Sequence, residues 1–181
     1  MTATQPPSLP RSRATRGRRL GPRARKSALV VHIVTAGAWI GIDVVLAVLV
    51  FTALTTDDVI TAAVSYQALE LFALWPLFLT GMACLVSGLV LGAGTRYGVV
   101  RYWWVVGKLV INVVFVALVP LALRPAVTAA ADYGSAMPTA RPAPEALADL
   151  IFPPIVSPLG LLAAVLLAVF KPWGRVRPRR R

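Results

Sequence analysis

A histidine, a tryptophan and an aspartate lie inside one long apolar stretch of the sequence. His32 is the only histidine of the chain, and Asp43 is one of seven acidic residues. At about 100° per residue, Trp39 and Asp43 both fall within about 20° of His32 on a helical wheel. Thr35 lies near the same line. The spacing predicts one polar face on a membrane-spanning helix, and such a face should point into a helix bundle or toward water.

A second pair of polar residues lies in a later apolar stretch, where Lys108 is followed one helical turn later by Asn112. Lys108 lies seven residues beyond Arg101, and His32 lies six residues beyond Lys26. At ~1.5 Å per residue, each side chain lies on the order of 10 Å past its flanking base. The two residues are therefore predicted to lie at a similar depth in the membrane.

Placing an ionised group in the middle of a membrane costs roughly 2.5–3.5 kcal/mol, and such groups often mark a function. A neutral His32 needs only one hydrogen bond, and Lys108 is shallow enough for its amino group to reach the membrane surface. A structural role therefore fits these two residues as well as a functional one. Asp43 lies three turns deeper than His32, so we expect it to be protonated or close to water.

The composition indicates which elements hold these residues. The chain of 181 residues is 57% hydrophobic and only 14% charged, whereas a soluble domain averages about 25% charged residues. The formal net charge of +12 is concentrated at the two ends, which is typical of basic tails that set membrane orientation. There is no basic domain with interleaved aromatic residues, so nucleic acid is not an expected partner. The single cysteine, Cys84, excludes an intrachain disulfide bond.

We predict an all-α fold, a polytopic four-helix bundle in the membrane. Windows of ~20 apolar residues give four spans, at about 28–53, 68–93, 103–123 and 150–170. The transmembrane domain at 27–171 lies between a disordered basic arm at 1–26 and a basic tail at 172–181.

The segment at 124–149 is rich in Ala and Pro and is predicted to be an outer loop, in which the stretch ALADLIF could add a short interfacial helix. The fourth span has three prolines near its start. Pro is tolerated in the first turn of a helix, so the regular helix is expected to begin near Pro154. Pro158 would then kink the helix or mark a later start.

The basic residues predict the orientation. Eight of them, from Arg11 to Lys26, precede the first span, two follow the second span, and six follow the fourth. The loop after the first span carries two aspartates and no base. The positive-inside rule therefore places both termini in the cytoplasm, in agreement with an even number of spans. Next to a span, such basic ends should attract anionic lipid headgroups at ~1 kcal/mol per residue.

Small residues predict close helix packing. Gly37 and Gly41 form a GxxxG pattern in the first span, and Gly88 and Gly92 form another in the second span, with Cys84 at the same spacing. Such patterns allow helix backbones to approach each other. Packing within one chain is the favoured interpretation, and a homo-oligomer is the alternative.

His32, Trp39 and Gly41, together with the run Gly107-Lys108-Leu109-Val110, resemble a group of small four- or five-span bacterial membrane proteins. The group includes the HemJ-type membrane protoporphyrinogen oxidases, the CopD copper-resistance proteins and predicted integral membrane proteins of unknown function. The resemblance covers about residues 27–123. It implies a multi-pass protein of the bacterial plasma membrane with a haem or porphyrin site formed by His32, Lys108 and Trp39, in which His32 is the metal ligand.

The chain departs from this group in two respects. It has no second histidine, so one subunit cannot supply two histidine ligands to a haem iron. Its methionines, Met1, Met82 and Met137, form no cluster of the soft ligands that copper(I) prefers, which weakens the copper interpretation.

Three functions remain open from the sequence. The first is a haem- or porphyrin-binding protein, enzymatic or not, with its site between the first and third spans in the cytoplasmic half. The second is a small oligomeric transporter whose path is lined by Asp43, His32, Asn112 and Lys108. The third is a non-catalytic accessory or assembly subunit whose polar residues are structural. The sequence contains no HExxH, P-loop or Gly-rich dinucleotide motif.

Overall fold

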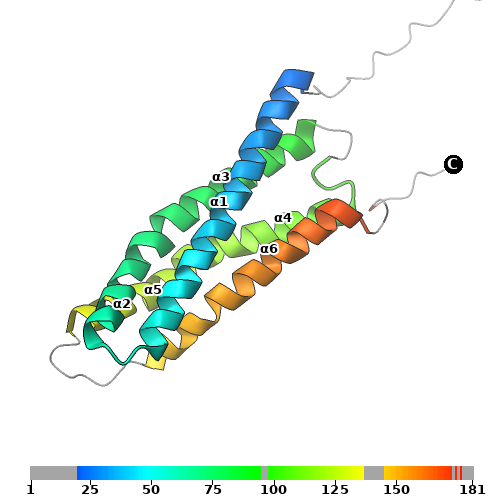
Figure 1. The fold of residues 1–181 in the computed structure, drawn as a ribbon. Helices are drawn as coiled ribbons and strands as arrows, with labels where there is room; N and C mark the ends of the chain where they lie inside the picture. Colours follow the sequence, from blue (N-terminus) through cyan, green and yellow to red (C-terminus); the bar gives the residue numbers. More distant parts are fainter. Residues whose placement is uncertain (1–19, 95–97, 137–144, 173, 175, 177–181) are drawn as a thin grey trace, which may run out of the picture.

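The computed structural model describes residues 20–94, 98–136, 145–172, 174 and 176. Within these residues the elements are helical: α1 (Pro22–Thr55), α2 (Val59–Ala73), α3 (Trp75–Gly94), α4 (Trp103–Leu118), the π-helix η1 (Val119–Leu123), α5 (Arg124–Ala136), the 3₁₀ helix η3 (Glu145–Ile151) and α6 (Pro153–Phe170). Figure 1 shows them as one elongated bundle, which confirms the predicted all-α fold. Most of the predicted arm and tail, and residues 137–144 of the predicted outer loop, lie outside the described residues.

Four stretches are long and apolar enough to cross a membrane: Pro22–Thr55, Val59–Gly94, Trp103–Ala136 and Asp149–Phe170. Each carries large apolar side chains on its outer surface, such as Val30, Leu79, Val113 and Leu166. Exposed apolar surface along every helix of a bundle is what contact with lipid requires. The chain is therefore a multi-pass integral membrane protein.

The order of the helices around the bundle determines which residues can meet. α1 packs against α3 and α6, and α4 packs against the same two helices. α1 and α4 therefore lie diagonally across the bundle, and their inward faces point at the same central axis. In Figure 1, the α1–α3 pair and the α4–α6 pair diverge toward the end of the bundle where α1 begins and α6 ends.

We call that end the terminal end and the opposite one the distal end. The backbone N–H of Leu20 donates to the carbonyl of Gly94 at 3.3 Å, and that of Val176 donates to the carbonyl of Arg101 at 3.0 Å. Both ends of the described chain therefore contact the connection between α3 and α4. This arrangement agrees with an even number of spans.

Prolines account for the interruptions of the long helices. The helix breaks at Leu74, between α2 and α3, two residues before Pro76. Proline has no N–H to donate and its ring clashes with the preceding turn. Pro120 likewise interrupts the α-helix, and the residues around it form the π-helix η1. α6 begins at Pro153, close to the predicted start, and continues through Pro158.

The structure differs from the sequence prediction at three boundaries. α1 begins at Pro22 rather than near residue 27, because proline is favoured at the first position of a helix. α2 begins at Val59, well before the predicted start of the second span. Residues 124–136, predicted to be a loop, form α5, while residues 145–151 form the 3₁₀ helix η3.

Packing against α2 explains why an Ala- and Pro-rich segment is helical. Gly134 of α5 lies so close to α2 that an added Cβ would be 2.8 Å from the carbonyl oxygen of Ala63. The rings of Tyr66 and Tyr133 meet edge to face, with centroids 5.8 Å apart. Alanine favours the helix, Pro125 lies in the first turn where proline is tolerated, and tertiary packing of this kind stabilises the helix further.

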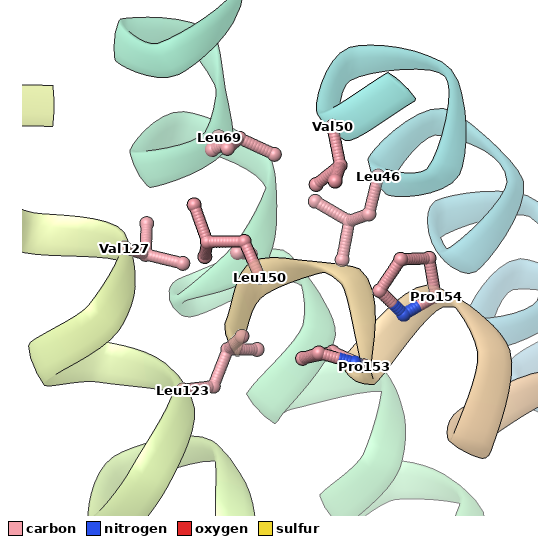
Figure 2. Close-up of a pocket in the computed structure, with 9 residues that line it drawn as sticks. Leu46, Val50, Leu69, Leu123, Val127, Leu150, Pro153 and Pro154 are labelled. Carbon is pink, nitrogen blue, oxygen red and sulfur yellow. The ribbon is translucent and has the colours of Figure 1, made fainter. Parts of the chain in front are cut away.

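The distal end of the bundle has a closed apolar core. Figure 2 shows its side chains converging on a small cavity. They come from α1, α2, η1, α5, η3 and α6, and the volume of the cavity is ≈ 10 Å³. We call these residues the distal core: Leu46, Val50, Leu69, Ala73, Leu123, Val127, Leu150, Pro153 and Pro154. The cavity has about the volume that a single water molecule needs, and its lining offers no polar side chain to hold one.

Candidate functional site

His32 lies on α1 with its ring against α3. Its Nδ1 atom is 3.1 Å from the carbonyl oxygen of Cys84 and 3.0 Å from the hydroxyl oxygen of Ser87. A carbonyl oxygen can only accept, so Nδ1 must carry a hydrogen. The Ser87 hydroxyl is itself within donating distance of the carbonyl of Ala83, at 2.7 Å. This network assigns neutral His32 to the Nδ1–H tautomer and leaves the lone pair on Nε2.

Small residues of α3 create the room for this ring. A Cβ added at Gly88 would lie 3.2 Å from Cε1 of His32, so any larger residue would press on the imidazole. The stripe of Cys84 and Gly88 therefore packs within the chain, as the sequence predicted. The other GxxxG pattern behaves differently, because added Cβ atoms at Gly37 and Gly41 would meet nothing within 4 Å.

The polar residues of α4 reach the same place from the opposite side of the bundle. Lys108 is near enough for its charge to act on both His32 and Cys84. The side chains of Thr35 and Asn112 both interact with the thiol of Cys84. We call these six residues the polar cluster: His32, Thr35, Cys84, Ser87, Lys108 and Asn112.

His32 and Lys108 therefore lie at a similar depth, as predicted. This is so although α1 and α4 have little contact with each other. Their side chains meet because α1 and α4 are diagonal and α3 fills the space between them. The sequence placed the site between the first and third spans. The structure adds α3 as the wall that holds the histidine.

Trp39 lies one turn deeper than the polar cluster and is almost fully buried, at 1% exposure. Its ring packs on Gly81 of α3, where an added Cβ would be 3.0 Å from the ring, and lies 6.4 Å from the ring of Phe115. Its indole Nε1 is buried without a hydrogen-bond partner, and so is Oδ1 of Asn112.

Asp43 lies one further turn along α1 and is 2% exposed. Its Oδ2 accepts a hydrogen bond of 2.7 Å from the hydroxyl of Ser157 on α6. The bond ties α1 to α6 at the boundary between the polar cluster and the distal core. Within the described structure, the hydrogen-bond partner of the Asp43 side chain is Ser157, not Lys108.

Two contributors to this site were not singled out from the sequence. Ser87 follows Cys84 by three residues and lies beside the predicted small-residue stripe, which could have drawn attention to it. Ser157 directly precedes Pro158 in an otherwise apolar helix, and no periodicity of the sequence points to it.

Chemically, the polar cluster offers one imidazole, one amine and one thiol. Among the described residues, no group of three or more His, Cys, Asp and Glu side chains could hold a metal ion. A metal held at His32 would therefore need ligands that the protein does not supply. Haem iron can be held in this way, because the porphyrin supplies its other nitrogen ligands.

Comparisons with protein-family models, curated proteins and solved structures find no match for this chain. The polar cluster must accordingly be interpreted from its own geometry.

Proposed function

We propose that this membrane protein binds haem or a porphyrin near the terminal end of its bundle, with His32 as the axial ligand. The observation that carries the proposal is the hydrogen bond between Nδ1 of His32 and the carbonyl of Cys84. A histidine that ligates a metal through Nε2 usually donates its other ring N–H to a carbonyl or carboxylate, which orients the ring and raises its basicity. His32 is held in that manner.

Lys108 supplies a second argument. Its electrostatic neighbours in the described structure are His32 and Cys84, and neither is a carboxylate. A lysine with no acidic neighbour in a membrane interior is expensive, and an anionic ligand would offset that cost. The carboxylate groups of a porphyrin have the required charge. The resemblance of His32, Trp39 and Lys108 to the HemJ-type group points to the same ligand.

When bound, a haem would supply a redox-active iron that the chain's own side chains lack. Binding is the function proposed, and any reaction would depend on the partner that exchanges electrons or porphyrin with it.

The test is an absorbance titration of the detergent-purified full chain with haem. We expect a Soret band whose position shifts on binding and which His32→Ala abolishes. In Ser87→Ala, the hydrogen bond from His32 to the carbonyl of Cys84 should remain. Haem affinity should fall by about tenfold, in the range seen when a hydrogen-bond partner of a metal ligand is removed. Thr80→Ala is the matched control, because Thr80 bonds only to carbonyls of its own helix. Unchanged spectra and affinity in His32→Ala would exclude His32 as the ligand.

A second candidate is a non-catalytic accessory subunit, and a specific observation favours it. His32 to Ser87 and Asp43 to Ser157 are both hydrogen bonds between helices, and such bonds stabilise bundles in lipid. In this case His32→Ala would lower the melting temperature of the protein without loss of any pigment. The transporter alternative has less support, because the apolar distal core interrupts a polar path across the bundle.

We also propose that the terminal end faces the cytoplasm of a bacterial plasma membrane, where it binds anionic lipid. Arg23, Arg25 and Lys26 are exposed on the first turns of α1, close to where the hydrocarbon layer should begin. Native mass spectrometry with mixed zwitterionic and anionic lipids tests the lipid part. Alanine at these three positions should reduce the number of anionic lipids retained, with Arg124, at the opposite end, as the control.

A further inference from the structure

Among the residues that the structure describes, two buried side-chain polar atoms have no hydrogen-bond partner: the Nε1 donor of Trp39 and the Oδ1 acceptor of Asn112. Buried polar groups in proteins are nearly always hydrogen-bonded to protein or to ordered water. Leaving one unpaired is costly, and more so where no solvent can reach it. A molecule that both accepts and donates a hydrogen bond could satisfy both atoms.

The two atoms come from opposite helices, and their residues lie about one helical turn apart in depth. Trp39 lies one turn beyond Thr35 on α1, and Asn112 lies one turn before Val116 on α4. Thr35 and Asn112 both interact with Cys84, while Trp39 and Val116 both flank Gly81. Asn112 therefore lies at the inner edge of the polar cluster, Trp39 follows one turn deeper, and Asp43 lies one turn beyond Trp39.

We propose that a buried water molecule lies between these two groups, accepts from Nε1–H of Trp39 and donates to Oδ1 of Asn112, and extends the polar cluster toward Asp43 as a path for protons. A proton that enters at the cluster is passed along hydrogen bonds and binds the Asp43 carboxylate. The reverse step returns it, so no bond other than O–H or N–H changes and no oxidant is needed.

The path is open to one side only. Beyond Asp43 and Ser157 the interior is the distal core, whose lining is apolar and whose cavity is ≈ 10 Å³. A chain of water molecules needs polar partners that this region does not offer. The titratable groups along the path are His32 of α1, Cys84 of α3 and Lys108 of α4. From α6, the neutral hydroxyl of Ser157 donates a hydrogen bond to Asp43.

This inference does not depend on haem binding, and its test uses the haem-free protein. The full chain in lipid vesicles is transferred to D₂O, and the carboxylic-acid C=O stretch of Asp43 is followed by infrared spectroscopy. The band is assigned by its loss in Asp43→Asn. Spectra are recorded from acidic to neutral pH so that the protonated form is sampled.

We expect Asn112→Leu and Trp39→Phe to slow deuteration of Asp43 by at least about tenfold, because exchange then needs rarer openings of the packed helices. Trp39→Phe keeps most of the ring packing and serves if Asn112→Leu does not fold. Leu71→Ala, on the exposed face of α2, should leave the rate unchanged. Equal rates in wild type and both polar-path variants would overturn the proposal. No band that Asp43→Asn removes at any pH would overturn it as well.

Discussion

The terminal and distal halves of the bundle have interiors of opposite character. The terminal half joins three helices around His32, Cys84 and Lys108, and two of these side chains remain partly exposed. The distal half joins α1, α2, α5, η3 and α6 around leucine, valine and proline side chains, of which Leu69 and Leu150 are almost fully buried. The same helix, α1, passes through both.

This difference indicates a division of roles. In lipid, apolar side chains gain little from leaving one apolar surface for another, so the distal core must stabilise the fold by close packing of shapes. Polar groups in a membrane are costly wherever they lie. Their concentration in one half therefore suggests that the distal half supplies the rigid support and the terminal half supplies the chemistry.

The largest effect on stability is expected from a substitution in the distal core. Leu69→Ala should destabilise the protein by about 2–5 kcal/mol, because it removes buried methyl groups and enlarges a cavity. Leu71→Ala on the same helix is the control, because Leu71 is 71% exposed and Leu69 only 1%. Thermal unfolding in one detergent, followed by circular dichroism, measures both. Equal melting temperatures for the two variants would show that the distal core is not the support of the fold.

The next largest loss of stability is expected at the boundary between the two halves. Ser157→Ala removes the donor to Asp43 and leaves a buried carboxyl oxygen without its bond, so we expect a loss of about 1–2 kcal/mol. A double-mutant cycle with Asp43→Asn isolates the coupling between the two residues. If the two substitutions prove additive, the bond between α1 and α6 contributes nothing measurable.

The sequence predicted the outline of this division but not its details. Helix number and type followed from long apolar stretches, and the shared face of His32, Trp39 and Asp43 followed from their spacing. Each span is apolar all round, so hydrophobic periodicity could not show which of its other residues point inward. The partners Ser87 and Ser157 depend on which helices are neighbours, and that is a property of the assembled bundle.

The α5 segment was mistaken for a loop for a related reason. Pro120 and Pro125, with the charged Arg124 between them, suggested a break in the span. In the structure, Pro120 is absorbed by a π-helical turn and Pro125 sits in the first turn of α5, where its missing N–H matters little. The alanines of the segment favour a helix, and packing on α2 stabilises it.

In the terminal half, the bond between His32 and Ser87 should have a smaller effect on stability. Ser87→Ala is expected to cost ~0.6 kcal/mol, the average for hydrogen bonds between membrane helices, because the Cys84 carbonyl still holds the ring. Thr80→Ala, whose hydroxyl bonds within its own helix, gives the baseline. A loss as large as that of Leu69→Ala would mean that the polar cluster, and not the distal core, supports the bundle.

The smallest effect should come from the helix cap at the distal surface, outside both interiors. Asp58 caps α2, and the hydroxyl and then the backbone N–H of Thr61 donate to its carboxylate and lower the pKa of Asp58. A lowered pKa in the folded state means that the cap's stabilisation is fully present above the unfolded value of about 3.9 and is lost as the pH falls through the folded pKa. Asp58→Asn keeps an oxygen acceptor and should remove this pH dependence.

NMR in detergent micelles measures this effect through the chemical shifts of the Asp58 carboxyl group and the Thr61 amide between neutral and acidic pH. Asp57→Asn is the neighbouring control. Shifts of Thr61 that do not follow the titration of Asp58 would rule out the cap, and they would leave the contrast between the two interiors untouched.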